Sequence, residues 1–306
     1  MKNEATIIAQ IIKSAKTSIQ KLNSQVVDII EVQKPTSIQY ALQLTKIVSK
    51  LSPLLGNLFE FRIVDELNSE KSEGISGQWF RQDPGFPDAC FKSDAIVTDN
   101  VGVEIKAWFP FATEITGRFK DSENVFIKDQ IYVALVAWIP EYVFWGKPII
   151  LDTLFVSGKS VAIARDTHYH QPPHYLVFEP EDTTQRTGNL QQTNTNGYVF
   201  QDERTKNKTL FKRAQKEVAK WNSEDLQYST DESYQQKLKA LFTKYPYRPD
   251  TNYAKIDRIQ HPEIEEFKTK VLNMEYKGKK VKEWAHLASL SIEDAELISS
   301  VEKLLL

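Results

Sequence analysis

The stretch SDAIVTDNVGVEIKAW, residues 93–108, decides the fold of this chain. Two apolar runs separated by an Asp-Asn pair at residues 99–100 predict a β-hairpin that turns at that pair. Side chains alternate between the faces of a strand, so VGVEIKAW should place Gly102, Glu104 and Lys106 on one face and apolar residues on the other. The hairpin therefore carries charged side chains inside a run that is otherwise suited to burial.

Asp94 opens the first strand of this hairpin, and the turn decides whether it faces Glu104. A strict two-residue loop places the two carboxylates on opposite faces. A loop of odd length or a β-bulge brings them together, and such irregularities are common beside active sites. Proximity in sequence favours Asp94 as the partner of Glu104, with Asp88 in the turn DPGFPDA as the alternative.

Two carboxylates beside a lysine indicate a particular chemistry. Carboxylate oxygens are hard ligands that suit Mg²⁺, which keeps several waters and binds substrate phosphate at its remaining positions. The metal acidifies a water, and a neighbouring lysine can orient that water or offset the charge of the transition state. These are the requirements of phosphodiester hydrolysis.

Short motifs in this region resemble those of the PD-(D/E)XK nuclease superfamily, to which most type II restriction endonucleases belong. Glu104 and Lys106 match its (D/E)XK part within VEIK. Its first Asp is matched by Asp88, in a literal Pro-Asp, or by Asp94 in SDA. Glu60, in GNLFEFRIVDEL, matches an acidic residue that the upstream helix of the superfamily often carries.

The resemblance runs roughly from residue 56 to residue 140. It implies a Mg²⁺-dependent endonuclease in which Asp94 and Glu104 bind the metal. A solvated hairpin with a Glu/Lys pair on its exposed face is the plainer alternative. Two features oppose that alternative: the run continues as AWFPF, and GFPDACFKSDAI places two Asp residues among aromatic side chains. Charges in such surroundings are costly unless they bind a metal or a partner.

The rest of the chain predicts an α/β (α+β) fold, with a restriction-endonuclease-like central mixed sheet flanked by helices. Helical spacing predicts helices over 5–30 and 37–50, and a third that begins at Ser52-Pro53. Short strands rich in Val, Ile and aromatic residues follow between 78 and 199, and SVAIAR is expected to be one of them. The predicted divisions are an N-terminal helical region (1–51), a catalytic core (52–200) and a C-terminal helical region (201–306).

Composition narrows the class of protein. The 306 residues are 41% hydrophobic with a net charge of −2, so any nucleic acid must be met by local basic patches. The single Cys90 fits a reducing cytoplasm, and no apolar run approaches the roughly 20 residues that span a bilayer. Walker and GxGxxG motifs are absent, so no nucleotide cofactor is expected. The absence of a GxSxG motif removes the commonest alternative class of hydrolase. The histidines of THYHQPPH fit a strand-end loop better than a metal site.

Three segments carry residues suited to DNA. One follows the ExK strand and would bring its basic side chains near the scissile phosphate; the second, TTQRTGNLQQTNTNGY, suits base edges; the third is a basic helix. The expected DNA contacts are Arg118, Lys120, Arg186, Gln191, Asn194, Lys208, Lys212 and Arg213.

Together these features predict a Mg²⁺-dependent type II restriction endonuclease that cleaves double-stranded DNA. A homodimer is expected because palindromic sites call for two-fold symmetry. The alternatives are a repair or structure-specific nuclease of the same superfamily, an inactive DNA-binding protein and, outside nucleic acids, a sugar-binding or metabolic protein with a chance ExK hairpin.

Overall fold

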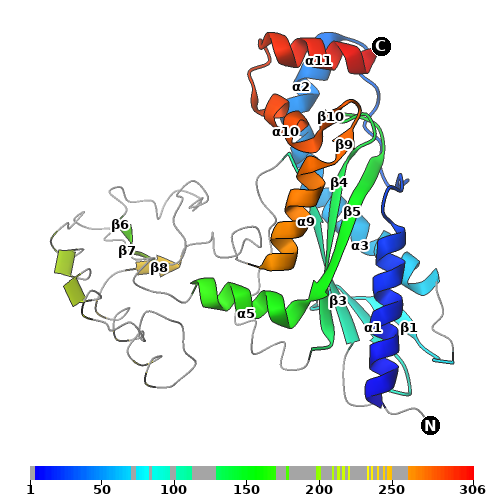
Figure 1. Ribbon diagram of the computed structural model, residues 1–306, viewed down its shortest axis with the longest axis vertical. Coiled ribbons are helices and arrows are strands. Elements are labelled where there is room, and N and C mark those ends of the chain that lie inside the picture. Colours follow the sequence, from blue (N-terminus) through cyan, green and yellow to red (C-terminus); the bar gives the residue numbers. More distant parts are fainter. Residues whose placement is uncertain are drawn as a thin grey trace. The chain divides into compact units, whose positions relative to one another are not determined.

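The computed structural model describes most of the chain (Figure 1). The described residues are 4–69, 74–82, 85–96, 101–111, 129–169, 177–178, 198–200, 247–249 and 261–306, with single positions between 209 and 244. The chain divides into two compact units. The first, here called the sheet unit, contains 1–116, 126–160 and 261–306, and the second contains 117–125 and 161–260.

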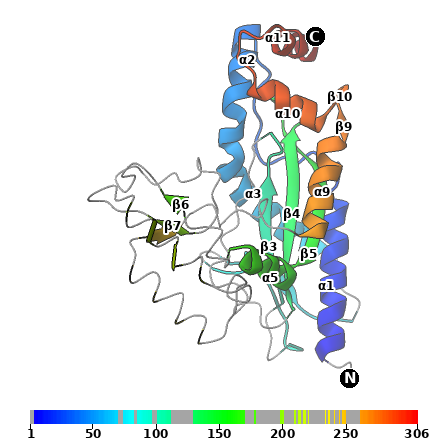
Figure 2. The same ribbon diagram turned by 60° about the vertical axis from the view of Figure 1, so that its left-hand side comes forward.

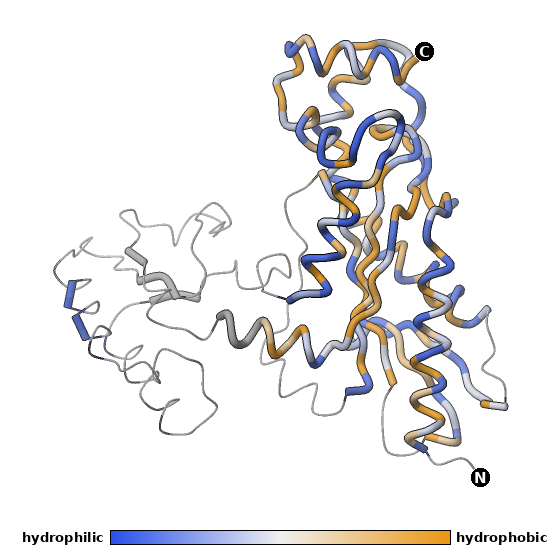
Figure 3. Tube along the Cα trace, in the orientation of Figure 1, coloured by the Kyte–Doolittle hydropathy of each residue, from blue (hydrophilic) through white to orange (hydrophobic). Residues whose placement is uncertain are grey.

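The sheet unit is built on a five-stranded mixed sheet with the order β1-β2-β3-β4-β5. Only the β3–β4 pair is parallel among these strands, and the other neighbours are antiparallel. Figure 3 shows that its central strands are largely hydrophobic, as strands covered on both faces should be. The strands are β1 (Gln78–Arg81), β2 (Ala89–Lys92), β3 (Val101–Trp108), β4 (Ile131–Pro140) and β5 (Pro148–Ser157).

Helices cover both faces of this sheet. Thr153 and Asp152 are neighbours on β5 and so point to opposite faces. The Thr153 hydroxyl donates to the carbonyl of Ile19 in α1 (Glu4–Lys21), whereas Asp152 pairs with Lys270 of α9 (Pro262–Asn273) at 2.6 Å. α3 (Ser52–Ser69) packs against α1 and lies on the same face of the sheet as α1. In Figure 2, α3 and α9 lie on either side of β3 and β4.

The helices of the two chain ends pack together. α11 (Ala295–Leu305) contacts α2 (Ile38–Ile47), and α10 (Val281–Ser289) contacts both α2 and α9. The Lys46 ammonium donates to the carbonyl of Ala288, at 2.7 Å, and to that of Leu290 near the end of α10. The predicted boundary at residue 201 is therefore wrong for the last helices, because residues 261–306 belong to the same unit as the N-terminal helices. The remaining small elements here are η1 (Val48–Leu51), β9 (Glu275–Tyr276) and β10 (Lys279–Lys280).

Two predicted elements were wrong. SVAIAR is not a strand but part of α5 (Gly158–Tyr169), a helix that begins directly after β5. The first predicted helix ends at Lys21 instead of near residue 30. Ser24 then has a φ of 64°, and its N–H donates to the Ile150 carbonyl at 2.7 Å, so the apolar residues that follow run beside β5. These β-branched residues bond to the backbone of edge strand β5 instead of continuing the helix.

The second unit contains residues 161–260, between Ser160 and His261 of the sheet unit, and a separate short segment, 117–125. Ser160, at the start of α5, lies 2.9 Å from the imidazole Nε2 of His261, the residue that precedes α9. Residues 161–260 therefore connect two residues of the sheet unit whose side chains are in contact. Within them, β6 (Val177–Phe178), β7 (Tyr198–Phe200) and β8 (Tyr247–Pro249) form a three-stranded sheet. Among the residues with described placement, no helix has the length and apolar character needed to cross a bilayer.

Candidate active site

The site is built by the first three strands of the sheet. β2 pairs with β3 so that Ala89 faces Val103 and Cys90 faces Gly102. Continuing this register by one residue places Asp88 opposite Glu104. Directly opposed residues of an antiparallel pair share a face, so the two carboxylates meet there.

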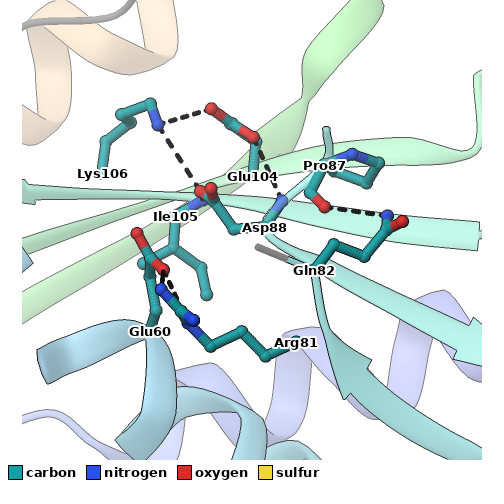
Figure 4. Close-up of polar contacts among 8 residues, drawn as sticks. All are labelled: Glu60, Arg81, Gln82, Pro87, Asp88, Glu104, Ile105 and Lys106. Carbon is teal, nitrogen blue, oxygen red and sulfur yellow. Dashed lines mark hydrogen bonds and ion pairs between the residues drawn. The ribbon is translucent and has the colours of Figure 1, made fainter. Parts of the chain in front are cut away.

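Each carboxylate also accepts a hydrogen bond from the other strand. The Ile105 N–H donates to Asp88 Oδ2 at 2.7 Å, and the Asp88 N–H donates to Glu104 Oε2 at 3.3 Å. The Lys106 ammonium lies 2.5 Å from Glu104 Oε1 and 3.5 Å from Asp88 Oδ2. Figure 4 shows this ammonium between the two acids. Asp88 and the Glu104-Ile105-Lys106 triplet thus form one compact cluster, here called the Asp88–Glu104–Lys106 cluster.

A second ion pair lies beside this cluster. Arg81, the last residue of β1, donates from Nε to Glu60 Oε2 at 2.9 Å, and its Nη2 lies 2.8 Å from the same oxygen. Figure 4 shows the Glu60–Arg81 pair on the other side of β3 from Glu104 and Lys106. The guanidinium also lies 4.3 Å from the centre of the exposed Phe61 ring. Glu60 is therefore anchored by a neighbouring strand and does not extend into solvent.

Burial and charge together set the protonation of this cluster. Burial raises the pKa of Glu104, repulsion from Asp88 adds to this, and the Lys106 ammonium opposes it. The pKa of Glu60 is also raised, by burial and by Asp88, although Arg81 and Lys106 offset part of the effect. Burial lowers the pKa of Lys106, but the carboxylates of Glu104 and Asp88 more than compensate and raise it above its usual value. Lys106 is therefore an ammonium at neutral pH.

The loop before Asp88 is held from two sides. The Gln82 side-chain amide donates to the Pro87 carbonyl at 3.1 Å and to the Cys90 sulfur, and the Gln82 N–H donates to the Asp88 carbonyl at 2.8 Å. On the other side, Pro87 lies directly over Gly102: a Cβ on that glycine would sit 2.2 Å from the proline Cγ. Glycine at this position is what lets the loop lie against β3 and present Asp88.

Asp94 does not reach this cluster, so the geometric reason for preferring it was wrong. The strand that pairs with β3 is residues 89–92, which is buried, and Asp94 lies after it in an exposed turn. The Asp-Asn hairpin expected at residues 99–100 lies outside the described residues. Glu104, Lys106 and Asp88 come together, and Glu60 stands close to them, as the alternative assignment required.

Most of the predicted DNA contacts cannot be located. Arg118, Lys120, Arg186, Gln191, Asn194 and Lys208 lie outside the described residues. Lys212 and Arg213 are exposed helical residues of the second unit.

Sequence reasoning missed Arg81, Gln82 and the Pro87–Gly102 contact. The signal was present in QWFRQDPGFPDACFK, where two short strands flank a turn with two prolines and a glycine. Pairing these strands with each other brings residues 81 and 82 next to Asp88, as β1 and β2 do here. Pairing residues 93–98 with β3 instead hid this arrangement.

We expect Gly102→Ala to disturb the site and the fold together. The new methyl must displace Pro87, whose ring cannot move independently of the backbone that carries Asp88. Overpacking of this kind destabilises by about 1–3 kcal/mol. Thermal unfolding should therefore show a lower Tm.

Gly56→Ala is the matched control. Gly56 lies in α3 and has nothing within 4 Å of an added Cβ. Replacing an unconstrained helical glycine by alanine stabilises by about 0.5–1 kcal/mol. A Gly102→Ala variant as stable as Gly56→Ala would contradict the tight packing of Pro87 on β3.

The donor set suits a hard divalent cation better than a structural metal. Among the described residues, no three His, Cys, Asp or Glu side chains form a metal-binding group. Asp88 and Glu104 nevertheless lie together, and the Lys106 ammonium is close to both. Two carboxylates, with water at the remaining coordination positions, suit Mg²⁺. Comparison of the chain with family models, curated proteins and solved structures found no match.

Proposed function

We propose that this chain is a Mg²⁺-dependent nuclease that hydrolyses phosphodiester bonds in double-stranded DNA, of the type II restriction endonuclease kind. The observation that carries the proposal is the Asp88–Glu104–Lys106 cluster. It unites the motif residues of the PD-(D/E)XK resemblance on two neighbouring strands. The order of elements also fits that resemblance: a helix with an acidic residue, three antiparallel strands, then a fourth strand parallel to the third.

Asp88 and Glu104 are the residues that would hold the ion. When bound, Mg²⁺ would acidify a water and offset negative charge on the phosphate. The site fits a cation because the carboxylates of Asp88, Glu104 and Glu60 outnumber the two basic side chains, and because Glu104, whose pKa is raised first by burial and further by Asp88, would be stabilised in its charged form by a bound cation. The hydrogen bonds from Ile105 and Asp88 would hold the two carboxylates in place.

Lys106 would act as a charged hydrogen-bond donor and not as a base. Its pKa is raised, so removing its proton near neutral pH is unfavourable. With a cation on the acids, the ammonium would be released from part of its pairing and could orient a water or donate to a phosphate oxygen. Donors placed where charge develops supply a large share of catalysis.

Arg81 and Gln82 would be positioning residues. Arg81 neutralises Glu60 beside the cluster, and Gln82 fixes the loop that carries Asp88.

We propose a homodimer for recognition of palindromic sites.

A direct assay tests the proposal. The purified protein is incubated with a long phage DNA and Mg²⁺, and in parallel with EDTA. Discrete fragments that need Mg²⁺ support a restriction endonuclease, and a smear supports a nuclease without sequence preference. DNA that stays intact but shifts on a gel would replace the enzyme with a DNA-binding protein.

We expect acidification to abolish cleavage at a higher pH than it would if the pKa of Glu104 had the usual value for a glutamate. Glu104 must be ionised to bind a metal, and its pKa is raised above the usual value of about 4.3. Protons and Mg²⁺ therefore compete as the pH falls through that raised pKa. Saturating Mg²⁺ should move the acid limb of the pH–rate profile to lower pH than limiting Mg²⁺ does.

The stability of the metal-free protein should respond in the opposite sense. A carboxyl whose pKa is raised on folding binds its proton more tightly in the folded state, so this group favours the fold at acid pH and less so as the pH rises. For the pH–rate prediction, an acid limb at the same pH with limiting and with saturating Mg²⁺ would show that Glu104 does not bind the metal.

A further inference from the structure

A surface suited to unpaired nucleotides lies beside the proposed site. The register of β1, β2 and β3 places Phe80 opposite Cys90 and Cys90 opposite Gly102, two residues before Glu104. Alternation therefore sets Phe80 and Lys92 on the face that carries the acids. The mechanism proposed above uses neither of them.

These side chains are an exposed aromatic ring and an exposed cation. Phe80 is 43% exposed, and the Lys92 ammonium lies 5.3 Å from the centre of its ring. An exposed ring with a cation over it, on the face of the sheet that carries the acids, offers a stacking surface. We call Phe80 and Lys92 the aromatic ledge.

The ledge ends at a cavity. A hollow of about 660 Å³ is bounded by the end of α3, the residues before β1 and the end of β2. Phe80 and Lys92 are among its lining residues, and Gln78 supplies an amide. A flat ring, a cation and hydrogen-bonding groups are what a nucleobase and its phosphate require.

We propose that the aromatic ledge and its cavity bind unpaired nucleotides of the DNA strand being cut. The proposal rests on the nuclease chemistry proposed above and not on its restriction type, and it adds that the substrate carries an unpaired stretch beside the bond that is cut. Lys92 lies four residues along β2 from Asp88, about 13 Å at the rise of a strand, which spans about four stacked nucleotides. Phe80 stacks on a base, Lys92 contacts a phosphate, and the cavity receives the next base. A continuous duplex keeps its bases stacked inside and offers no such ring face.

Binding measured without metal tests the ledge independently of cleavage. Fluorescence anisotropy in EDTA compares a blunt duplex, a duplex with a single-stranded extension, and an oligo-dT single strand. The wild type should bind the two probes with unpaired nucleotides more tightly than the blunt duplex. Phe80→Ala should weaken those two probes by about five- to a hundred-fold, the loss expected for one base–aromatic stack, and Phe80→Tyr should restore them. Lys92→Ala should flatten the salt dependence for oligo-dT by about 0.7 in the log–log slope.

Matched controls and distinct outcomes make the test decisive. Tyr40 of α2 is 51% exposed and lies outside the ledge, so Tyr40→Ala should bind all three probes as the wild type does. Equal binding by Phe80→Ala and Tyr40→Ala, with duplex DNA still cut, would overturn the ledge and leave the nuclease standing. Ledge-dependent binding without any cleavage would overturn the nuclease and leave the ledge. If Phe80→Ala unfolds by circular dichroism, Phe80→Leu, which keeps bulk without a flat ring, takes its place with the same expected loss.

Discussion

Lys106→Ala should abolish cleavage while DNA binding survives. Its ammonium touches both Glu104 and Asp88, and its raised pKa keeps it a cation throughout the neutral range. Removing one preorganised donor at a reacting centre costs about a hundred- to a thousand-fold in rate. Binding is shared among many phosphate contacts, so its loss at one of them is small. Single-turnover cleavage of a labelled duplex and anisotropy in EDTA measure the two properties separately.

The control for Lys106→Ala must separate chemistry from folding. Without the ammonium, two carboxylates face each other on a partly buried surface, and the variant should be less stable without metal than with Mg²⁺. Thermal unfolding at both conditions reports this. Lys50→Ala removes an exposed lysine outside the cluster and should leave rate, binding and Tm unchanged. Substantial cleavage by Lys106→Ala at neutral pH would count heavily against the proposed chemistry.

Asp88→Asn should eliminate both cleavage and stabilisation by Mg²⁺, whereas Asp94→Asn should change neither by more than about two-fold. An asparagine at position 88 keeps an oxygen that can accept from the Ile105 N–H, so the loop should hold its place. It removes the charge that the metal requires, and we expect a loss of about a hundred-fold or more in rate. A ligand that binds only the folded state raises Tm, so the Mg²⁺-dependent shift reports metal binding directly.

The two variants are each other's control, since each replaces one aspartate of the same short segment. Asp94 is exposed and lies in the turn after β2, so its loss leaves the Asp88–Glu104–Lys106 cluster intact. The opposite result, with Asp94→Asn inactive and Asp88→Asn active, would place the metal at the far end of β2. That would require a rearrangement of β2 and β3.

Local pattern was sufficient for much of this fold. The run VGVEIKAW has the bounds of β3, and its alternation correctly placed Glu104 and Lys106 on one face. IYVALVAWI and PIILDTLFVS lie in β4 and β5, because long β-branched runs have few other uses. The mixed sheet flanked by helices, with helical additions at both chain ends, follows from such segments.

Pairing between strands could not be read in the same way. The rule for tight turns favoured residues 93–98 as the partner of β3, but the strand that pairs with β3 is Ala89–Lys92, whose first three residues are buried and which is joined to β3 by a longer connection. The identity of the acidic partner depended on that choice alone. The packing of α11 on α2 joins the two ends of the chain and has no local signal at all.

The contact of Ser160 with His261 has a consequence for how this protein could change over time. Because Ser160 and His261 are in contact within the sheet unit, residues 161–260 form an insertion between two adjacent points of that unit, separate from the short segment 117–125. A segment inserted at such a point can be lengthened, exchanged or shortened while β5 and α9 keep their places, since domain insertion is best tolerated where both ends meet. The sheet unit can thus stay constant in evolution while residues 161–260 diverge.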